Sequence, residues 1–222
     1  MVNFITLFSS IALAGMSVMA APSSVVITVK NSCSSSIQVN QLTNDEAYGS
    51  STMVAAGSST KISVSSKWGG RIWARQGCSG SSDCQSGSPA SLAEFLLNGG
   101  YNMDYYDISF VDGFNLPMTI APNGGSGSGY LCGTPKCTTL PSCPSGLEDK
   151  DSNGKVIGCK SPCTAYGTSE YCCTDSERGS CGSSSYASAV QSACPEVYSY
   201  AFDDNTSMFS CSPTNGYTVT FC

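Results

Sequence analysis

Residues 132–181 read CGTPKCTTLPSCPSGLEDKDSNGKVIGCKSPCTAYGTSEYCCTDSERGSC and hold eight of the 14 cysteines in this 222-residue chain. Glycine, proline and serine are also dense in this segment, so it has little hydrophobic core of its own. Such a segment depends on disulfides, which contribute about 2–4 kcal/mol each to stability. The sequence therefore predicts a loop-rich region that is held together by disulfides.

The cysteine total favours disulfides over a metal site. Fourteen is an even number, and in an oxidising compartment it predicts seven disulfides. Metal binding is the alternative, because Cys159 and Cys163 are separated by three residues and Cys172 adjoins Cys173. Adjacent cysteines fit one tetrahedral site poorly, and the chain has no histidine. We expect no metal and no cofactor, and counting alone leaves the cysteine pairing open.

On both sides of this segment the chain reads as short strands separated by Gly/Ser turns. Alternating or β-branched residues, typical of strands, occupy residues 25–29, 37–39, 61–64, 71–74 and 217–221. The pattern predicts a mainly β fold in which a β-sandwich is interrupted by a cysteine-rich insert. We expect one domain, residues 21–222, with 21–131 and 195–222 mainly in the sandwich and 132–194 in the loop and helix insert.

One helix is expected, at residues 185–193. Its apolar residues Tyr186, Val190 and Ala193 share one face with Ala189, and serines are available to cap its start. Residues 91–94 also match the capping-box pattern S-x-x-E. We interpret that match as a decoy, although periodicity alone does not reject a short helix there.

Residues 1–20 are typical of a secretion signal. Residues 4–20 form an uncharged, mostly apolar run that ends in the small-residue cleavage pattern Val18-Met19-Ala20. A membrane anchor is the alternative, but the run is about 17 residues long and is diluted by serine and threonine, whereas a span needs roughly 20 apolar residues. We expect a mature chain from Ala21, secretion to the extracellular space and no transmembrane segment.

Composition excludes several classes of function. Ten Lys and Arg against 16 Asp and Glu give a net charge of −6, and the cations do not cluster. A surface that neutralises nucleic-acid phosphates is therefore excluded. The absence of histidine rules out Ser-His-Asp and Cys-His catalysis and histidine-ligated zinc.

Eight short motifs occur over nearly the whole mature chain and together resemble one family. They are Gly70-Arg71-Ile72-Trp73-Ala74-Arg75, Leu92-Ala93-Glu94-Phe95, Tyr106-Asp107-Ile108-Ser109, Gly113-Phe114-Asn115-Leu116-Pro117-Met118, Thr168-Ser169-Glu170-Tyr171-Cys172-Cys173, Cys194-Pro195, Tyr198-Ser199-Tyr200 and Val219-Thr220-Phe221-Cys222. Each is weak alone, but their order and spacing are specific, and the chain is identified as a member of the thaumatin-like proteins, relatives of thaumatin and osmotin. The resemblance implies an antiparallel β-sandwich and a disulfide-rich loop domain with one short helix.

The resemblance also implies a disulfide pattern. The implied pairs are Cys33–Cys222, Cys132–Cys211, Cys137–Cys194, Cys143–Cys159, Cys163–Cys172 and Cys173–Cys181. Cys78 and Cys84 remain and are expected to pair with each other. Typical large members of the family have one more disulfide near this position, so this chain is shortened there, near the expected cleft.

An acidic cleft between the sandwich and the loop domain is implied by the same resemblance. The matching residues are Arg71, Glu94, Asp107, Asp112 and Asp203. Carboxylates accept hydrogen bonds from sugar hydroxyls, and the flanking aromatic residues Tyr105, Tyr106 and Phe114 are expected to stack on sugar faces. For glycoside hydrolysis, Glu94 would be the general acid and Asp107 or Asp112 the base or nucleophile.

Structural roles are the alternatives for these charged residues. Glu94 would form a buried ion pair with Arg71, and the acidic pair at 203–204 would lie in a solvated loop. Asp107 and Asp112 lie five residues apart, so one uninterrupted strand would place them on opposite faces. They share a cleft only if the chain turns before Asp112, which is followed by glycine.

The sequence Asn205-Thr206-Ser207 is the single N-glycosylation sequon of the chain. It begins two residues after Asp203. A glycan on Asn205 would therefore stand at the rim of the expected cleft and restrict large substrates.

Three functions follow from the resemblance. The one we favour is a monomeric, secreted defence, antifungal or cell-wall protein of the apoplast or wall that binds β-1,3-glucan or another wall polysaccharide. The second is a weak endo-β-1,3-glucanase with Glu94 as general acid. The third is an inhibitor or effector that acts on a foreign protein, such as a hydrolase.

Overall fold

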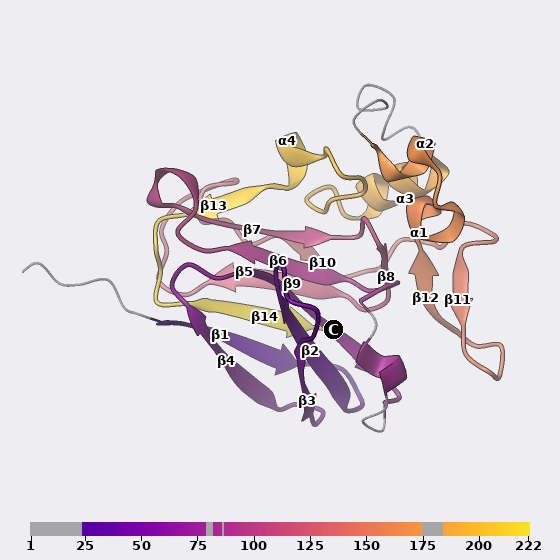
Figure 1. Ribbon diagram of the computed structural model, residues 1–222, viewed down its shortest axis with the longest axis horizontal. Coiled ribbons are helices and arrows are strands. Elements are labelled where there is room, and N and C mark those ends of the chain that lie inside the picture. Colours follow the sequence, from indigo (N-terminus) through magenta and orange to yellow (C-terminus); the bar gives the residue numbers. More distant parts are fainter. Residues whose placement is uncertain (1–23, 79–81, 86, 175–183) are drawn as a thin grey trace, which may run out of the picture.

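The computed structural model describes residues 24–78, 82–85, 87–174 and 184–222. The expected secretion signal and Cys181 lie outside these residues. Two sheets form the body of the molecule, and the cysteine-rich part gathers at one end of it (Figure 1). No helix within the described ranges is long and apolar enough to cross a bilayer.

The first sheet has five strands. They are β1 (Ser24–Asn31), β4 (Ser59–Ser65), β9 (Met118–Pro122), β10 (Lys136–Cys137) and β14 (Tyr217–Phe221). They lie in the order β10-β9-β14-β1-β4, with β1 antiparallel to β4 and parallel to β14. The expected antiparallel sandwich thus contains a parallel pair, because its first and last strands are joined by the whole domain and not by a hairpin.

The second sheet has six strands. They are β2 (Ile37–Thr43), β3 (Ser50–Val54), β5 (Gly69–Gln76), β6 (Leu92–Leu96), β7 (Asp104–Ser109) and β13 (Phe209–Cys211). They lie in the order β13-β7-β6-β5-β2-β3, and all neighbours are antiparallel. Residues 92–94 of the capping-box match lie in β6, and the Ser91 hydroxyl donates to the carbonyl of Leu116 at 2.7 Å. Its interpretation as a decoy is confirmed.

The two sheets enclose the main hydrophobic core. Every second residue is buried along β14, as period-two alternation requires of a strand with one face on a core. The Tyr217 ring centroid lies 5.2 Å from that of Phe95 and 5.1 Å from that of Tyr106, both on the opposite sheet. Its hydroxyl donates to Asp104 at 2.9 Å. Burying an aromatic side chain contributes roughly 1.5–3 kcal/mol, so this cluster holds the sheets together.

The cysteine-rich part combines a small sheet with short helices. Strands β8 (Gly113–Phe114), β11 (Glu148–Lys150) and β12 (Val156–Lys160) form a sheet in the order β11-β12-β8. The helices are α1 (Pro162–Tyr166), α2 (Ser169–Cys172) and α3 (Ser185–Ala193). Helix α3 coincides with the expected helix, and the Ser184 hydroxyl accepts from the Ala187 amide at 3.0 Å as its cap.

Helices beyond the expected one are too short for periodicity to reveal. Helix α1 has five residues and α2 has four. A fourth helix, α4 (Asp204–Ser207), precedes β13, and the 3₁₀ helices η1 (Ser82–Gln85) and η2 (Gly100–Asn102) lie in loops of the sandwich. Since none completes two turns, no apolar stripe marks them in the sequence.

Six disulfides join described residues. They are Cys33–Cys222, Cys78–Cys84, Cys132–Cys211, Cys137–Cys194, Cys143–Cys159 and Cys163–Cys172. These pairs coincide with six of the seven expected pairs, and the seventh, Cys173–Cys181, involves a residue outside the described ranges. The Cys33–Cys222 bond spans 189 residues and joins the two ends of the sandwich.

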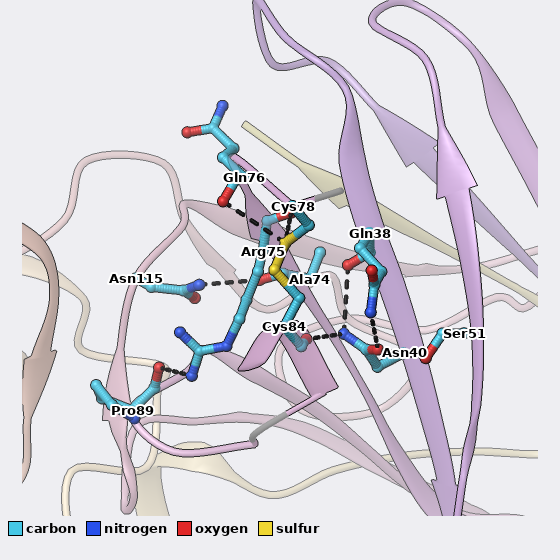
Figure 2. Close-up of a disulfide and its surroundings, with 10 residues drawn as sticks. All are labelled: Gln38, Asn40, Ser51, Ala74, Arg75, Gln76, Cys78, Cys84, Pro89 and Asn115. Carbon is cyan, nitrogen blue, oxygen red and sulfur yellow. Dashed lines mark hydrogen bonds between the residues drawn. A yellow bond between two sulfur atoms is a disulfide. The ribbon is translucent and has the colours of Figure 1, made fainter. Parts of the chain in front are cut away.

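The short loop closed by Cys78 and Cys84 is attached to the six-stranded sheet (Figure 2). Asn40 of β2 donates to the Cys84 carbonyl at 3.0 Å and accepts from the Ser51 hydroxyl at 2.7 Å. Beside the loop, the buried side chain of Arg75 donates to the Pro89 carbonyl at 2.8 Å. Cys84 lines a separate cavity of about 580 Å³. Contrary to expectation, none of the described residues of this shortened loop lines either of the two cavities that contain Glu94 and Asp107.

Replacing both Cys33 and Cys222 by serine should cost more stability than the same change at Cys78 and Cys84. The first bond spans 189 residues and the second spans 6, and the loop-closure model assigns about 5 kcal/mol to the longer loop and about 2 kcal/mol to the shorter. Urea denaturation of the two double variants measures the difference. Equal losses of unfolding free energy would contradict the entropic account.

Candidate functional site

Three neighbouring strands bring charged side chains into one row on the outer face of the six-stranded sheet. Arg71 of β5 pairs with Glu94 of β6, and Glu94 pairs with Asp107 of β7. Directly opposite residues in antiparallel strands have Cβ atoms about 4.5–5.5 Å apart and project from the same face. Residues that are far apart in the sequence therefore become immediate neighbours through strand register alone.

Asp112 joins this row because the chain turns sharply after β7. The Gly113 amide donates to the Phe110 carbonyl at 2.9 Å, and β8 then leaves to pair with β12. Gly113 has φ +117°, and a Cβ there would lie 2.2 Å from the Cys159 carbonyl oxygen, so the turn requires glycine. The turn expected before Asp112 is thus present, and Asp107 and Asp112 line one cavity of about 390 Å³. This cavity, lined also by Glu94, Tyr198 and Asp204, is the acidic groove.

The ion pair of Arg71 in this structure is with Asp112. Arg71 Nη1 lies 3.7 Å from Asp112 Oδ2, and the two side chains are 35% and 39% exposed. Among the described residues, Arg71 and Glu94 do not form the ion pair that was the structural alternative. The Arg71 charge on the neighbouring strand nevertheless lowers the pKa of Glu94. At this exposure the pair contributes about 0–1 kcal/mol, so it adds little to the stability of the fold.

Asp203 and Asp204 have different surroundings. Asp203 is buried and does not line the cavity, because its carboxylate accepts hydrogen bonds from the Ser199 hydroxyl at 2.8 Å and the Thr206 hydroxyl at 2.8 Å. Asp204 does line the cavity, and it accepts from the Tyr198 hydroxyl at 2.6 Å. The acidic residue at this wall is therefore Asp204, and Asp203 holds the turn into α4.

Tyr198 and Asp204 are site residues that the sequence analysis did not identify. Burial and the bond to Asp204 raise the pKa of Tyr198, so its hydroxyl stays protonated and donates. The adjacency of Asp203 to Asp204 and the Tyr198-Ser199-Tyr200 motif were the available signals. Neither says which of two adjacent carboxylates faces the groove.

The aromatic residues Tyr106 and Phe114 lie in the core and not in the groove. The Tyr106 hydroxyl donates to the Gly133 carbonyl at 2.6 Å, and the Phe114 ring lies 5.2 Å from the Phe110 ring. Strand alternation explains the difference in β7, since Tyr106 faces the opposite sheet while its neighbours Tyr105 and Asp107 face outward. Tyr105 lines the continuation of the groove.

The environment makes both central carboxyl groups hold their protons more tightly. Burial raises the pKa of Asp107 well above its ordinary value, and the charges of Glu94 and Asp204 raise it further. Burial also raises the pKa of Glu94, against the lowering effects of a Ser109 hydrogen bond and the Arg71 charge. Such a pair titrates as a unit, so it can both donate and accept hydrogen bonds.

Asp107 is the most constrained carboxyl group of the site. Asp107 is only 8% exposed. Its Oδ1 atom has no hydrogen-bond partner in the part of the chain that the structure describes. A buried oxygen without a partner costs about 1–3 kcal/mol. The same ranges contain no group of three or more His, Cys, Asp or Glu arranged to hold a metal ion.

A β-sandwich joined to a disulfide-rich insert, with carboxyl groups in a groove on one sheet, is the architecture of the thaumatin-like class. The model of the thaumatin family matches residues 31–222. This chain belongs to the thaumatin family.

Two curated relatives agree with this assignment, and one solved structure shares the fold. The chain is 38% identical over 222 residues to a glucan endo-1,3-beta-glucosidase of Prunus avium, with 88% of this chain and 89% of that protein covered. It is 41% identical over 226 residues to pathogenesis-related thaumatin-like protein 3.5 of Cryptomeria japonica, with 89% of each covered. A laminaripentaose-producing beta-1,3-glucanase in complex with laminaritetraose has a TM-score of 0.62 at 14% identity, with 90% of this chain and 99% of that chain covered. That last likeness is one of fold.

Replacing Asp107 by asparagine should make the protein less sensitive to rising pH. A carboxyl group whose pKa is raised in the folded state keeps its proton while the unfolded chain loses it, so its contribution to stability is complete below the ordinary pKa of 3.8 and is lost as the pH rises through the folded value. Asparagine does not ionise, so the variant does not lose this stability as the pH rises. Melting temperatures of both proteins from pH 3 to pH 8 test it.

In that experiment the low-pH end is the internal control. Near pH 3 the Asp107 carboxyl is protonated in both states, so the two melting temperatures should differ least there. The Asp107→Asn protein should gain relative to wild type as the pH rises. Parallel curves would show that burial of Asp107 does not oppose its ionisation.

Proposed function

We propose that the protein binds β-1,3-glucan or a related wall polysaccharide in the acidic groove, as a secreted monomer with a defence or cell-wall role. The observation that carries the proposal is the cross-strand pair Glu94–Asp107, which lies in a surface groove beside Asp112 and Asp204. Sugar hydroxyls both donate and accept hydrogen bonds, and two neighbouring carboxyl groups of raised pKa offer both kinds of partner. The names of the Prunus avium and Cryptomeria japonica relatives support a glucan ligand and a pathogenesis-related role.

A weak endo-β-1,3-glucanase is the second candidate, with Glu94 as general acid. The raised pKa of Glu94 suits an acid that must be protonated near neutral pH. Asp107 is a poor base or nucleophile, because it is nearly buried and resists ionisation. Hydrolysis would therefore depend on Asp112, which is more exposed and paired with Arg71.

Binding is the stronger proposal because it places fewer requirements on the spacing and ionisation of the carboxyl groups than hydrolysis does. A carboxyl group that lines the groove can contact a sugar hydroxyl, whatever its distance from the next carboxyl group. Hydrolysis also requires two carboxyl groups at a defined separation, about 5–5.5 Å for retention or about 6.5–9.5 Å for inversion. It further requires that the second group be ionised, which the surroundings of Asp107 oppose.

Glu94→Gln should weaken binding to insoluble β-1,3-glucan by about tenfold, the loss expected from one hydrogen bond of roughly 1.4 kcal/mol. The measurement is co-sedimentation of the purified, disulfide-intact protein with the polysaccharide. Glu46→Gln is the matched control, because Glu46 is an exposed glutamate outside the groove. Wild-type protein that stays in the supernatant would refute the binding proposal.

Reducing-sugar release by the same samples separates the two candidates. Under the binding proposal neither wild type nor Glu94→Gln releases sugar. Release by wild type that disappears in folded Glu94→Gln would establish the glucanase and the acid role of Glu94.

Asn205 is proposed as a glycosylation site. It is exposed on α4, next to Asp204 at the wall of the groove. Peptide mass spectrometry of protein secreted by a glycosylating host, before and after enzymatic deglycosylation, should show a glycan there that Asn205→Gln abolishes. An unmodified wild-type peptide would contradict this, and the same spectra identify the mature N-terminus, expected at Ala21.

A further inference from the structure

The acidic groove continues along β6 and β7 past the carboxyl pair. A second cavity of about 410 Å³ shares Glu94, Asp107 and Met208 with the first and extends to Leu96 and Tyr105. The carboxyl pair therefore lies in the middle of a longer groove and not at its end.

Strand register explains this continuity. The cross-strand pairs Leu92–Ser109, Glu94–Asp107 and Leu96–Tyr105 follow one another at every second residue, so all three project from the same face. The outer pairs are separated by four residues along the strand, which is about 13 Å. The floor of the groove is thus a row of three cross-strand pairs, and the middle pair carries the two carboxyl groups.

One end of this row of pairs is acidic, and the other end is mainly apolar. Beyond Ser109, the first end adds the carboxylates of Asp112 and Asp204. At the other end Leu96 is 49% exposed, and the Tyr105 hydroxyl donates to the Gly100 carbonyl at 3.1 Å. That bond holds the ring beside Leu96, and a Cβ at position 99 would lie 3.2 Å from atoms of both side chains, so Gly99 leaves space for them.

We propose that the groove holds an internal segment of a linear β-glucan, with sugar units on both sides of the Glu94–Asp107 pair and with the Leu96–Tyr105 end as an apolar stacking subsite. This inference rests on the proposed binding of glucan and adds the mode of recognition to it. A sugar ring has an apolar face of C–H groups that packs on an aromatic ring, and hydroxyl groups at its edge that suit carboxylates. The division of the groove into an acidic end and an apolar end offers both.

A groove that binds several consecutive sugar units should distinguish short oligomers from long ones. An oligomer of two units occupies the central carboxyl pair, whereas one of six units also reaches Tyr105. The test is isothermal titration calorimetry of the mature, disulfide-intact protein with β-1,3-linked glucose oligomers of two and six units. Tyr105→Ala should weaken binding of the six-unit oligomer by about tenfold and change binding of the two-unit oligomer by less than about twofold.

Two further variants separate stacking from other effects. Tyr105→Phe keeps the ring and loses the bond to Gly100, so it should bind the six-unit oligomer within about twofold of wild type. Tyr166→Ala removes an exposed tyrosine of α1 that lines neither half of the groove and should match wild type. If Tyr105→Ala fails to fold, Leu96→Ser tests the same end.

The outcomes distinguish this inference from the proposed function. An equal loss for both oligomer lengths, or no loss for either, overturns the stacking subsite while glucan binding stands. Wild-type protein that binds neither oligomer nor insoluble β-1,3-glucan overturns the proposed function itself. A length-dependent loss that Tyr105→Phe restores supports the inference.

Discussion

The antiparallel register of β5, β6 and β7 is the constraint on which the site depends. It places Arg71, Glu94 and Asp107 in one row on the outer face. The intervening residues, among them Phe95 and Tyr106, face the opposite sheet and form the core. A slip of one residue would bury the charges and expose the aromatic side chains. The hydrophobic core therefore holds the register, and through the register it holds the groove.

The disulfide-rich insert contributes to the site indirectly. Strand β8 is drawn out of the sandwich to pair with β12, whose Cys159 is bonded to Cys143. The tight turn at Gly113 that this pairing requires directs Asp112 back toward Arg71. An exposed ion pair adds little free energy, so the covalent and backbone constraints place this carboxylate. The sandwich and the insert therefore both contribute residues or constraints to the groove.

The buried carboxyl group of Asp107 lowers the free energy of unfolding when it is ionised. A carboxyl group that is nearly buried, with an oxygen that lacks a partner among the described residues, is costly to keep ionised. The neighbouring carboxylates Glu94 and Asp204 increase that cost. The unfavourable setting of Asp107 is typical of residues that are placed for binding or chemistry.

Local patterns in the sequence were sufficient to predict the mainly β fold, the helix at 185–193 and the cysteine-rich insert, because alternation, capping and cysteine density depend on near neighbours. Motif resemblance supplied the pairings of the cysteines and the identity of Glu94 and Asp107. Packing in three dimensions decided the rest, including the parallel pairing of β1 with β14 and the choice of Asp204 over Asp203. It also placed Tyr106 in the core and Tyr105 in the groove. The facing of adjacent residues depends on which strands they pair with, and those partners lie far away along the chain.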